Sequence, residues 1–312
     1  MDMKKNPSLR GCLLVFAAGS LWGTIGLFVK ELEQTGSTPG LTSLLRVMFA
    51  FLIMATACCA KYGIKALAIG RRTLLACALL GLVCHGVYNI FYSLAVTLAG
   101  VSVSAVLLNI APVFTLLFSA LLFGERITWT KAIAIILNIA GCILAATNGR
   151  FDVRALSVVG LLCGAGAGIC YALTAIFGRL AAGKANSFVM SMYSYLFAAI
   201  FLALWTRPWQ EPTPLNAGVL IWSFLYALIP TAVAYVLYYQ GLQSITESSK
   251  IPVIASVETV IATVIGVLLY HEHLGICSMI GIALVLLSII VMNITVKIKR
   301  TGRQCICRQA DI

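Results

Sequence analysis

The chain carries ten apolar runs, each about twenty residues long, separated by short polar connections. This feature constrains the fold more than any other, because an apolar run of that length can cross the hydrocarbon core of a bilayer as a helix. The runs are continuously apolar and do not alternate, so they are not the strands of a membrane barrel. We therefore expect an all-α integral membrane protein with ten transmembrane helices. The predicted spans are approximately 11–30, 39–60, 73–93, 98–122, 131–148, 157–178, 187–206, 216–239, 249–270 and 274–296.

The composition agrees with lipid as the solvent for most of the chain. Hydrophobic residues make up 61% of the 312 residues and charged residues only 10%, with a mean hydropathy of +1.01. Soluble domains average about 25% charged residues. The net charge of +12 would suit a nucleic-acid-binding protein, but the basic residues lie in short loops and tails rather than on one soluble face. We expect no nucleic-acid partner.

The sequence shows no pattern for a cofactor or a metal. The 11 cysteines are scattered through the apolar runs without a C-x-x-C pair, and cysteine is common as a small side chain in apolar surroundings. His271 and His273 lie close together in a short loop without further ligands, which favours a structural turn over a metal site. No phosphate-binding loop or dinucleotide fingerprint is present at an appropriate place. We expect neither a cofactor nor a bound metal.

The two halves of the chain repeat one another. Lys30 and Arg179 each close an apolar run and lie 149 residues apart, and Glu125 and Glu272 each follow an apolar run and lie 147 residues apart. Further pairs at these distances are Gly11 with Gly160, Tyr88 with Tyr235, and Tyr92 with Tyr239. A fixed long-range period of this kind is typical of transporters built from two membrane repeats.

We place the first repeat at 11–148 and the second at 157–296. Each contains five predicted spans, an odd number, so the second repeat must enter the membrane from the opposite side. The sequence therefore predicts two inverted five-helix repeats related by a pseudo-two-fold axis in the membrane plane. Two opposed copies provide a physical basis for alternating access, because two gates built from the same parts can open in turn around a central site.

Lysine and arginine residues predict the orientation in the membrane. If the N-terminus is cytoplasmic, 17 of the 22 lie in cytoplasmic segments and 4 in outer loops, with Arg46 inside a span. Cytoplasmic loops are enriched in these residues, so we expect both termini in the cytoplasm and the protein in the cell (cytoplasmic) membrane. Residues 297–312 would form a basic cytoplasmic tail that lies against the anionic inner leaflet.

Several short motifs occur in the order of a known family. They are Leu21-Trp22-Gly23 in the first span, Arg46 in the second, and Pro112-Val113-Phe114 followed by Phe123-Gly124-Glu125-Arg126 at the end of the fourth. With ten spans in two five-helix halves, the chain resembles the EamA-type members of the drug/metabolite transporter superfamily from about residue 11 to 296. The resemblance implies a central cavity lined mainly by the first, third, fourth, sixth, eighth and ninth helices, with export of small organic metabolites as the common activity.

The second half departs from this pattern. Glu258-Thr259 stands opposite Ala111-Pro112 of the first half, and His271-Glu272-His273 takes the place of Gly124-Glu125-Arg126. The first of these departures puts an ionisable residue inside the ninth span.

Three ionisable residues lie at membrane depth: Arg46, His85 and Glu258. A charged side chain near the bilayer centre costs at least about 2.5–3.5 kcal/mol, so each needs a reason to be there. Glu258 either faces the cavity, where it binds a substrate amine or carries a coupled proton, or is a structural carboxyl that is neutral or paired with Arg46. Arg46 is either a packing cation and carboxylate partner or a clamp for a substrate carboxylate.

A polar and aromatic stripe runs along the third helix and has a counterpart on the eighth. It consists of His85, Tyr88, Asn89 and Tyr92, with Tyr235 and Tyr239 in the second repeat. The spacing puts the first four on one helix face. A polar cavity would accommodate such a stripe, and interhelical hydrogen bonds or an interfacial aromatic belt are the alternatives. His85 is either a hydrogen-bonded core histidine or a proton relay.

Five further residues are cavity candidates. They are Trp22 and Thr24 on the first helix, Asn109 on the fourth, Tyr171 on the sixth and Ser256 on the ninth. Stacking on Trp22 would suit an aromatic or cationic substrate, and ordinary packing is the alternative. Pro112 removes a backbone hydrogen bond and predicts a kink near Leu108.

These residues predict a secondary transporter or facilitator that moves small organic metabolites, amino acids or related compounds, across the cytoplasmic membrane by alternating access, in the direction of export. Export of drugs and import of a sugar or nucleotide derivative are the alternatives within transport. We do not expect a membrane-embedded enzyme, because the candidate groups are spread over three spans; a transport-dead sensor is the remaining alternative. The expected partners are the small-molecule substrate, the lipid bilayer and, in a coupled mechanism, protons.

Overall fold

The computed structural model describes residues 7–99, 101–147, 157–181, 186–210, 215–270 and 275–293. Every regular element in these residues is a helix, and ten helical segments are long and apolar enough to cross a membrane. The prediction of an all-α protein with ten spans is confirmed. The predicted basic tail and the turn at His271-Glu272-His273 lie outside the described residues.

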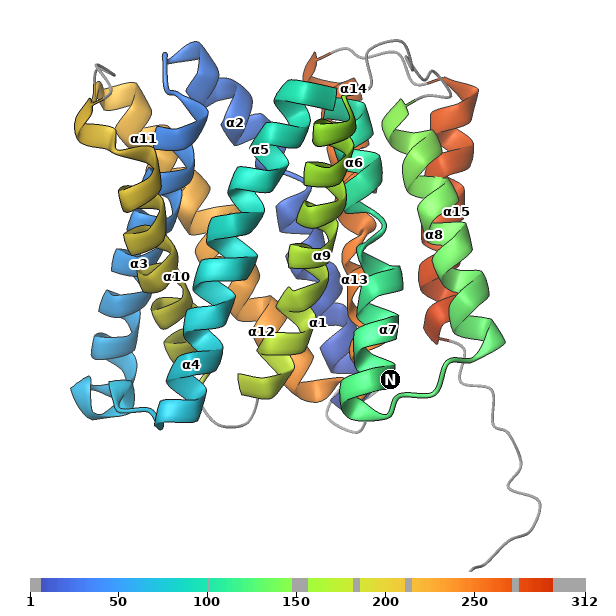
Figure 1. Cartoon of the computed structure of the whole chain (residues 1–312), viewed down its shortest axis with the longest axis horizontal. Coiled ribbons are helices and arrows are strands. Elements are labelled where there is room, and N and C mark those ends of the chain that lie inside the picture. Colours follow the sequence, from blue (N-terminus) through green and yellow to red (C-terminus); the bar gives the residue numbers. More distant parts are fainter. Residues whose placement is uncertain are drawn as a thin grey trace, which may run out of the picture.

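The first half of the chain contributes five of these spans (Figure 1). The first span combines α1 and α2, the third combines α4, the π-helical segment η3 and α5, and the fourth combines α6 and α7. The elements are α1 (Pro7–Trp22), α2 (Ile25–Gln34), α3 (Pro39–Tyr62), η2 (Ile64–Leu67), α4 (Arg71–Leu79), η3 (Leu80–Val87), α5 (Tyr88–Ala99), α6 (Val101–Leu108), α7 (Ala111–Phe123) and α8 (Trp129–Thr147).

The second half contributes the other five spans with a similar pattern of interruptions. Its third span contains the π-helical segment η5, and its fourth is divided into α13 and α14. The elements are α9 (Val158–Ala181), α10 (Ser187–Thr206), η4 (Pro208–Gln210), α11 (Ala217–Ala227), η5 (Leu228–Val233), α12 (Ala234–Ser244), η6 (Ser248–Lys250), α13 (Ile251–Ala255), α14 (Val257–Tyr270) and α15 (Ile276–Asn293).

The fourth span of each half is broken, for a different local reason in each. Pro112 is the second residue of α7 and has no N–H to bond back to the preceding turn, so the kink predicted near Leu108 is present. In the second half the break falls at Ser256, whose hydroxyl donates to the Val253 carbonyl at 2.6 Å and so competes with the helix ladder. Both breaks interrupt backbone pairing inside the membrane, which membrane proteins tolerate where the backbone is buried or borders a cavity.

The two halves are inverted with respect to each other. α7 ends at the lower end of the bundle in Figure 1, whereas its counterpart α14 ends at the upper end. α1 begins and α15 ends at the lower end, so both ends of the described chain lie on the same side (Figure 1).

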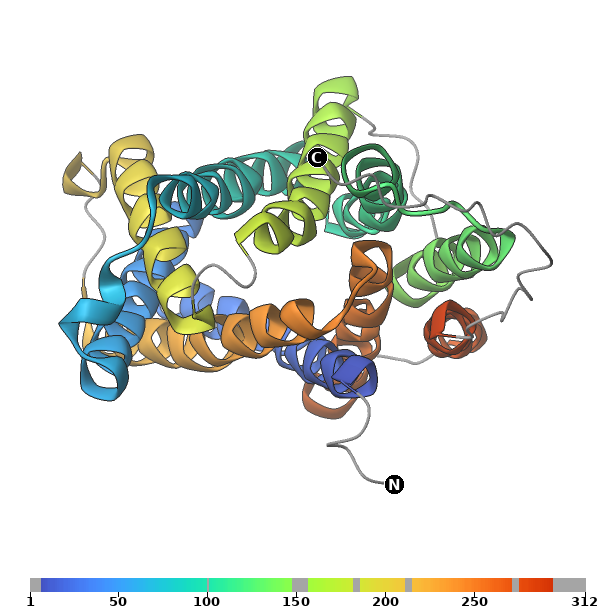
Figure 2. The same cartoon turned by 90° about the horizontal axis from the view of Figure 1, so that it is seen from below.

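Helices of the two halves pack against each other throughout. α3 lies against α10, α1 against α12, and α5 against α9. α8 and α15 lie side by side at one edge of the molecule (Figure 2), where a Cβ on Gly141 would lie 2.7 Å from the amide nitrogen of Val285. Only a residue without a side chain permits that approach. The centre of the bundle is therefore bounded by both halves.

Candidate substrate cavity

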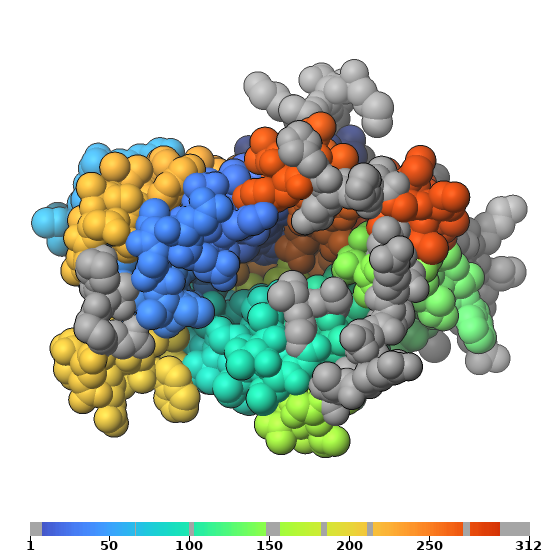
Figure 3. Space-filling view, turned by 90° about the horizontal axis from the view of Figure 1, so that it is seen from above, coloured from blue at the N-terminus to red at the C-terminus, as the bar shows by residue number. Residues whose placement is uncertain are grey.

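A cavity of about 590 Å³ lies between the two halves. It reaches the upper end of the bundle in Figure 1, where Lys30 of α2 and Tyr270 of α14 line its mouth. Seen from that end, the surface is hollowed between α2 and α14 on one side and α5 and α6 on the other (Figure 3). The volume is that of a site for a small molecule, since such sites measure about 300–1,000 Å³.

Nine of the thirteen residues singled out from the sequence line this cavity. They come from both halves. Eight of them lie on seven different helical elements, and the ninth lies in the break between α6 and α7. They are Trp22, Arg46, His85, Tyr88, Tyr92, Asn109, Tyr171, Tyr235 and Glu258. The predicted stripe on the third span and its partner on the eighth thus meet in space.

Three of the predicted residues are used elsewhere. The Thr24 hydroxyl donates to the carbonyl of Leu21 at 2.7 Å, which closes the break between α1 and α2. Tyr239 is fully buried in the packed core beside the cavity. Ser256 accepts a hydrogen bond from the Asn138 amide and holds the break between α13 and α14. None of the three is part of the cavity lining in this conformation.

Aromatic rings form a platform in the cavity wall. The ring centroid of Tyr235 lies 4.7 Å from that of His85 and 5.0 Å from that of Trp22. Tyr171 packs edge-on against Trp22 at 6.1 Å, and Tyr88 lies 6.3 Å from Tyr171. We call these five residues the aromatic platform. Rings arranged in this way offer apolar faces for the hydrocarbon part of a ligand and can attract a cation.

Glu258 lies in the first turn of α14, directly after the break at Ser256, and lines the cavity. Tyr171 of α9 lines the same cavity. No salt bridge to Glu258 occurs among the residues that the structure describes. The alternative of an ion pair with Arg46 is therefore not realised in this conformation.

Arg46 reaches the cavity from α3 and is held by neutral partners. Its Nη1 donates to the Tyr226 hydroxyl at 3.2 Å and its Nη2 to Asn89 Oδ1 at 3.3 Å. The guanidinium carbon also lies 5.1 Å from the centre of the Tyr226 ring. These contacts fix the plane of the guanidinium but leave its positive charge without a carboxylate partner in the described part of the chain.

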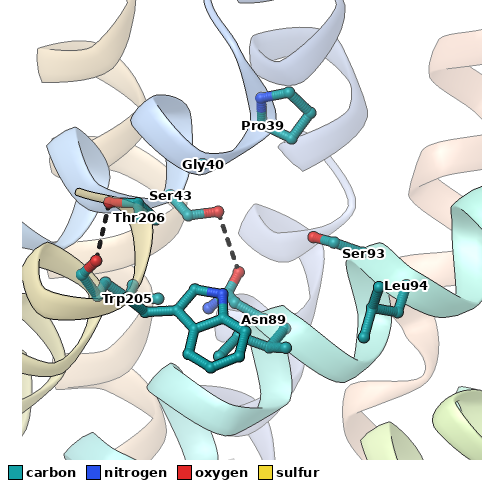
Figure 4. Close-up of a pocket in the computed structure, with 10 residues that line it drawn as sticks. Pro39, Gly40, Ser43, Asn89, Ser93, Leu94, Trp205 and Thr206 are labelled. Carbon is teal, nitrogen blue, oxygen red and sulfur yellow. Dashed lines mark hydrogen bonds between the residues drawn. The ribbon is translucent and has the colours of Figure 1, made fainter. Parts of the chain in front are cut away.

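Asn89 faces a smaller pocket of about 170 Å³ between α3, α5 and α10 (Figure 4). Its Oδ1 accepts hydrogen bonds from Ser43 and Arg46, and its amide nitrogen donates to the His85 carbonyl. Asn89 therefore does not line the central cavity, contrary to the expectation for the stripe. It acts one layer behind the cavity wall, by positioning Arg46.

Three nitrogen atoms of the cavity-lining residues are buried without a hydrogen-bond partner in the described structure. They are Nε1 of Trp22, Nε of Arg46 and Nε2 of His85. Buried polar groups in folded proteins almost always have a partner. Trp22 Nε1 and Arg46 Nε can only donate, so the missing partner is an acceptor such as a carboxylate oxygen.

Two π-helical segments border the cavity at related positions. η3 supplies Cys84 and His85, and η5 supplies Pro230. Wide turns of this kind occur mostly at functional sites in helices. Periodicity did not predict them, although Pro230, which cannot donate to a helix ladder, is a signal for the second one.

The end of the bundle opposite the cavity mouth is closed by a charged cluster around Glu125, which follows α7. Its Oε1 accepts from Arg179 Nη1 at 2.5 Å and from the Ser248 amide at 2.6 Å, and its Oε2 accepts from the Ser249 hydroxyl at 2.7 Å. Lys131 Nζ lies 3.6 Å from Oε2. We call these five residues the Glu125 cluster. It ties the end of the first repeat to two segments of the second.

The Glu125 carboxylate is stabilised in its ionised form. Burial alone would raise the pKa of Glu125, since its side chain is only 6% exposed. Hydrogen bonds from the Ser249 hydroxyl and from the amides of Ser248 and Ser249, together with the charge of Lys131, outweigh burial and hold the pKa below its usual value. The Glu125 carboxyl is therefore ionised at neutral pH, as a partner for the charges of Lys131 and Arg179.

The two ends of the bundle share one contact. In the Glu125 cluster the guanidinium of Arg179 lies 4.1 Å from the centre of the Phe123 ring. At the cavity mouth Lys30 Nζ lies 3.4 Å from the centre of the Tyr270 ring. Lys30 and Arg179 are the pair 149 residues apart, and Phe123 and Tyr270 are 147 apart. The inverted repeat thus places the same cation–ring contact at a closed end and at an open end.

Comparison with known proteins identifies the family. The model of the EamA-like transporter family matches residues 9–147 and again residues 158–294. An uncharacterized transporter of Bacillus subtilis, YwfM, is 28% identical over 93% of this chain and 96% of its own length. An uncharacterized transporter of Archaeoglobus fulgidus is 26% identical over 87% of this chain and 92% of its own length.

A solved crystal structure of a protein has the same fold, with a TM-score of 0.78 at 21% identity over 91% of this chain and 96% of that one. The ten spans and the bacterial and archaeal relatives identify a multi-pass protein of the cell membrane. The resemblance seen in the sequence motifs is confirmed: the chain belongs to the EamA-like transporter family, within the drug/metabolite transporter superfamily.

Proposed function

We propose that this transporter exports small organic solutes that carry both an amine and a carboxylate, amino acids or related compounds, by alternating access. The observation that carries the proposal is that Glu258 and Arg46 line one cavity and form no ion pair with each other in this conformation. Two opposite charges held apart in a cavity of this size complement a ligand with two opposite charges of its own.

The binding mode follows from the donors and acceptors. The amine of the solute would bind at Glu258. Its carboxylate would accept from Arg46 Nε and Trp22 Nε1, the two unpartnered donors. The five residues of the aromatic platform line the same cavity as Arg46 and Glu258. An apolar or aromatic side chain would pack on that platform.

Glu258 is also the group that we expect to couple transport to protons. A carboxyl at membrane depth without a cation partner is more stable when protonated. A substrate amine would supply the missing cation and displace the proton, so proton and substrate would compete for the same carboxyl. A transporter that exchanges the substrate for a proton across the membrane is an antiporter.

The end at which the cavity opens suggests which side of the membrane this conformation faces. The Glu125 cluster lies at the end where the chain begins, which the distribution of lysine and arginine predicts to be cytoplasmic. The cavity then opens to the outside in this conformation. Transport requires the cluster to separate while the mouth at Lys30 and Tyr270 closes, and the shared cation–ring contact supports equivalent roles for the two ends.

The test is flux through purified protein in proteoliposomes. An aromatic amino acid would be compared with the amine that lacks its carboxylate and with the acid that lacks its amine. We expect transport of the amino acid to exceed that of either analogue by at least about tenfold, because a charged hydrogen-bond partner contributes about 1.5–3 kcal/mol. Flux of the amine alone at the full rate would instead support export of cationic drugs, and flux of none of the three would contradict the proposal.

A further inference from the structure

A basic loop joins α3 to α4 at the end of the bundle where the chain begins (Figure 1). Its residues 61–72 include Lys61, Lys65, Arg71 and Arg72 and contain no acidic residue. All four basic residues are exposed. We call residues 61–72 the basic loop.

The basic loop is held against α10 rather than projecting freely. The Tyr193 hydroxyl of α10 donates to the Leu67 carbonyl at 2.8 Å. The ring of Tyr62 packs edge-on against that of Phe188 at 5.8 Å, and Lys61 Nζ lies 5.3 Å from the centre of the Phe188 ring. The first part of the basic loop is therefore tied to α10.

Three cations of the basic loop have no counter-charge of their own. Lys65, Arg71 and Arg72 form no ion pair with any residue that the structure describes. The two described acidic residues at this end, Glu125 and Glu247, are both engaged by other cations. Those cations are Lys131 and Arg179 for Glu125, and Lys131 and Lys250 for Glu247.

Apolar side chains flank these cations on the outside of the bundle. Ile64 is 77% exposed and Leu75, one turn into α4, is 61% exposed. Both lie where two membrane spans end, so their side chains meet the boundary between acyl chains and headgroups. An occupant that presents an apolar chain next to an anionic group matches this arrangement.

We propose that the basic loop binds anionic phospholipid headgroups through Lys65, Arg71 and Arg72, with the acyl chains against Ile64 and Leu75. Clusters of cations directly beside a membrane span attract anionic lipid. The bound headgroup would neutralise charges that the chain itself leaves unpaired and would steady the basic loop on α10. This surface is separate from the cavity and does not depend on which solute is transported.

The test uses the full chain in nanodiscs of phosphatidylcholine with stepwise increasing phosphatidylglycerol, read out by Tm. We expect phosphatidylglycerol to raise Tm in a saturable manner. A triple variant, Lys65→Gln, Arg71→Gln and Arg72→Gln, should need at least about tenfold more phosphatidylglycerol for half of the effect, since each cation near an anionic surface contributes about a fivefold gain in association.

The matched control removes three exposed cations outside the basic loop, as Arg10→Gln, Arg126→Gln and Arg207→Gln. This control should keep the full Tm response. A Lys65→Arg variant should also keep it, which separates loss of charge from loss of fold. An undiminished response in the basic-loop variant, or loss of the response in the control variant, would overturn the proposal.

Discussion

Polar side chains in this bundle differ in whether they find a hydrogen-bond partner within the chain. Thr24 and Ser256 bond to carbonyls three residues earlier in their own helices. Side chains of this first kind need nothing further in order to lie in lipid. Trp22 and Arg46 instead retain a buried donor without a partner, and both line the cavity. Under the proposed function, the partner of these two donors is the carboxylate of the solute.

Substitution of Glu258 should separate proton coupling from substrate binding. We expect Glu258→Gln to abolish the accumulation of substrate that depends on a pH gradient, because the amide cannot exchange a proton. Substrate–substrate counterflow should persist, since the amide oxygen still accepts a hydrogen bond. Both rates are measured in proteoliposomes, with Glu33→Gln, an exposed glutamate on α2, as the control. Unchanged dependence on pH would remove Glu258 from the coupling step.

Arg46 should discriminate between solutes by their carboxylate. We expect Arg46→Lys to raise KM for an amino acid by at least about tenfold, because an ammonium keeps the charge but loses the planar set of donors, and such bonds contribute about 1.5–3 kcal/mol. KM for the corresponding amine should change little. Equal losses for both solutes would show that Arg46 holds the packing of α3 and does not bind a carboxylate.

Helical elements were predictable where one residue type decides them. The ten spans follow from apolar length, and the break between α6 and α7 follows from Pro112. The break at Ser256 has no proline at that position; it depends on Asn138 of α8, which donates to Ser256 and Ser288 across the bundle. A contact between residues 118 positions apart leaves no local pattern in the sequence. The π-helical segments were not predicted either, although Pro230 is a local signal for the second one.

The cavity residues also divide into those whose position follows from local sequence and those whose position depends on contacts between helices. The repeat and the helical spacing predicted that Tyr88 and Tyr235 lie in the cavity, because each is fixed by its position on a helix face. Asn89 has the same spacing but is drawn behind the wall by Ser43 and Arg46. Side-chain partners of this kind depend on how different helices pack together. Such contacts leave no periodic pattern in a single sequence.

The Glu125 cluster joins three elements, and its pH dependence follows from one carboxyl. The pKa of Glu125 is lowered in the closed cluster, so its ionised form stabilises closure. That stabilisation is fully present above the solvated pKa of about 4.3 and is lost as the pH falls through the lower pKa of the cluster. We expect the cavity to become accessible from the end that holds the cluster only as the pH there falls through this lowered pKa.

Glu125→Gln should mimic this opening at neutral pH. Loss of the charge should weaken closure by about 2 kcal/mol, or about 30-fold in the open-to-closed ratio, and should abolish the pH response. Glu247→Gln is the matched control, since this glutamate is 39% exposed and pairs with Lys131 and Lys250 at the surface, where ion pairs contribute little. Equal accessibility in both variants, measured by thiol labelling, would show that Glu125 does not hold the end closed.

At the scale of the whole molecule, the inverted repeat makes the two ends equivalent in sequence but different in state. Arg179 over Phe123 lies within a complete cluster at the closed end, while Lys30 over Tyr270 borders the open mouth. A conformation with the roles exchanged needs no new parts, only the movement of one set of helices against the other. Alternating access therefore requires that the same cavity open to each side in turn.

The most direct measurement is the labelling of one cavity residue from each side of the membrane. Asn109→Cys, in a cysteine-depleted background, would be exposed to a membrane-impermeant thiol reagent in oriented vesicles. We predict labelling from the outer side, additional labelling from the cytoplasmic side after Glu125→Gln, and protection by substrate on both sides. Labelling from one side alone in both backgrounds would contradict alternating access through this cavity.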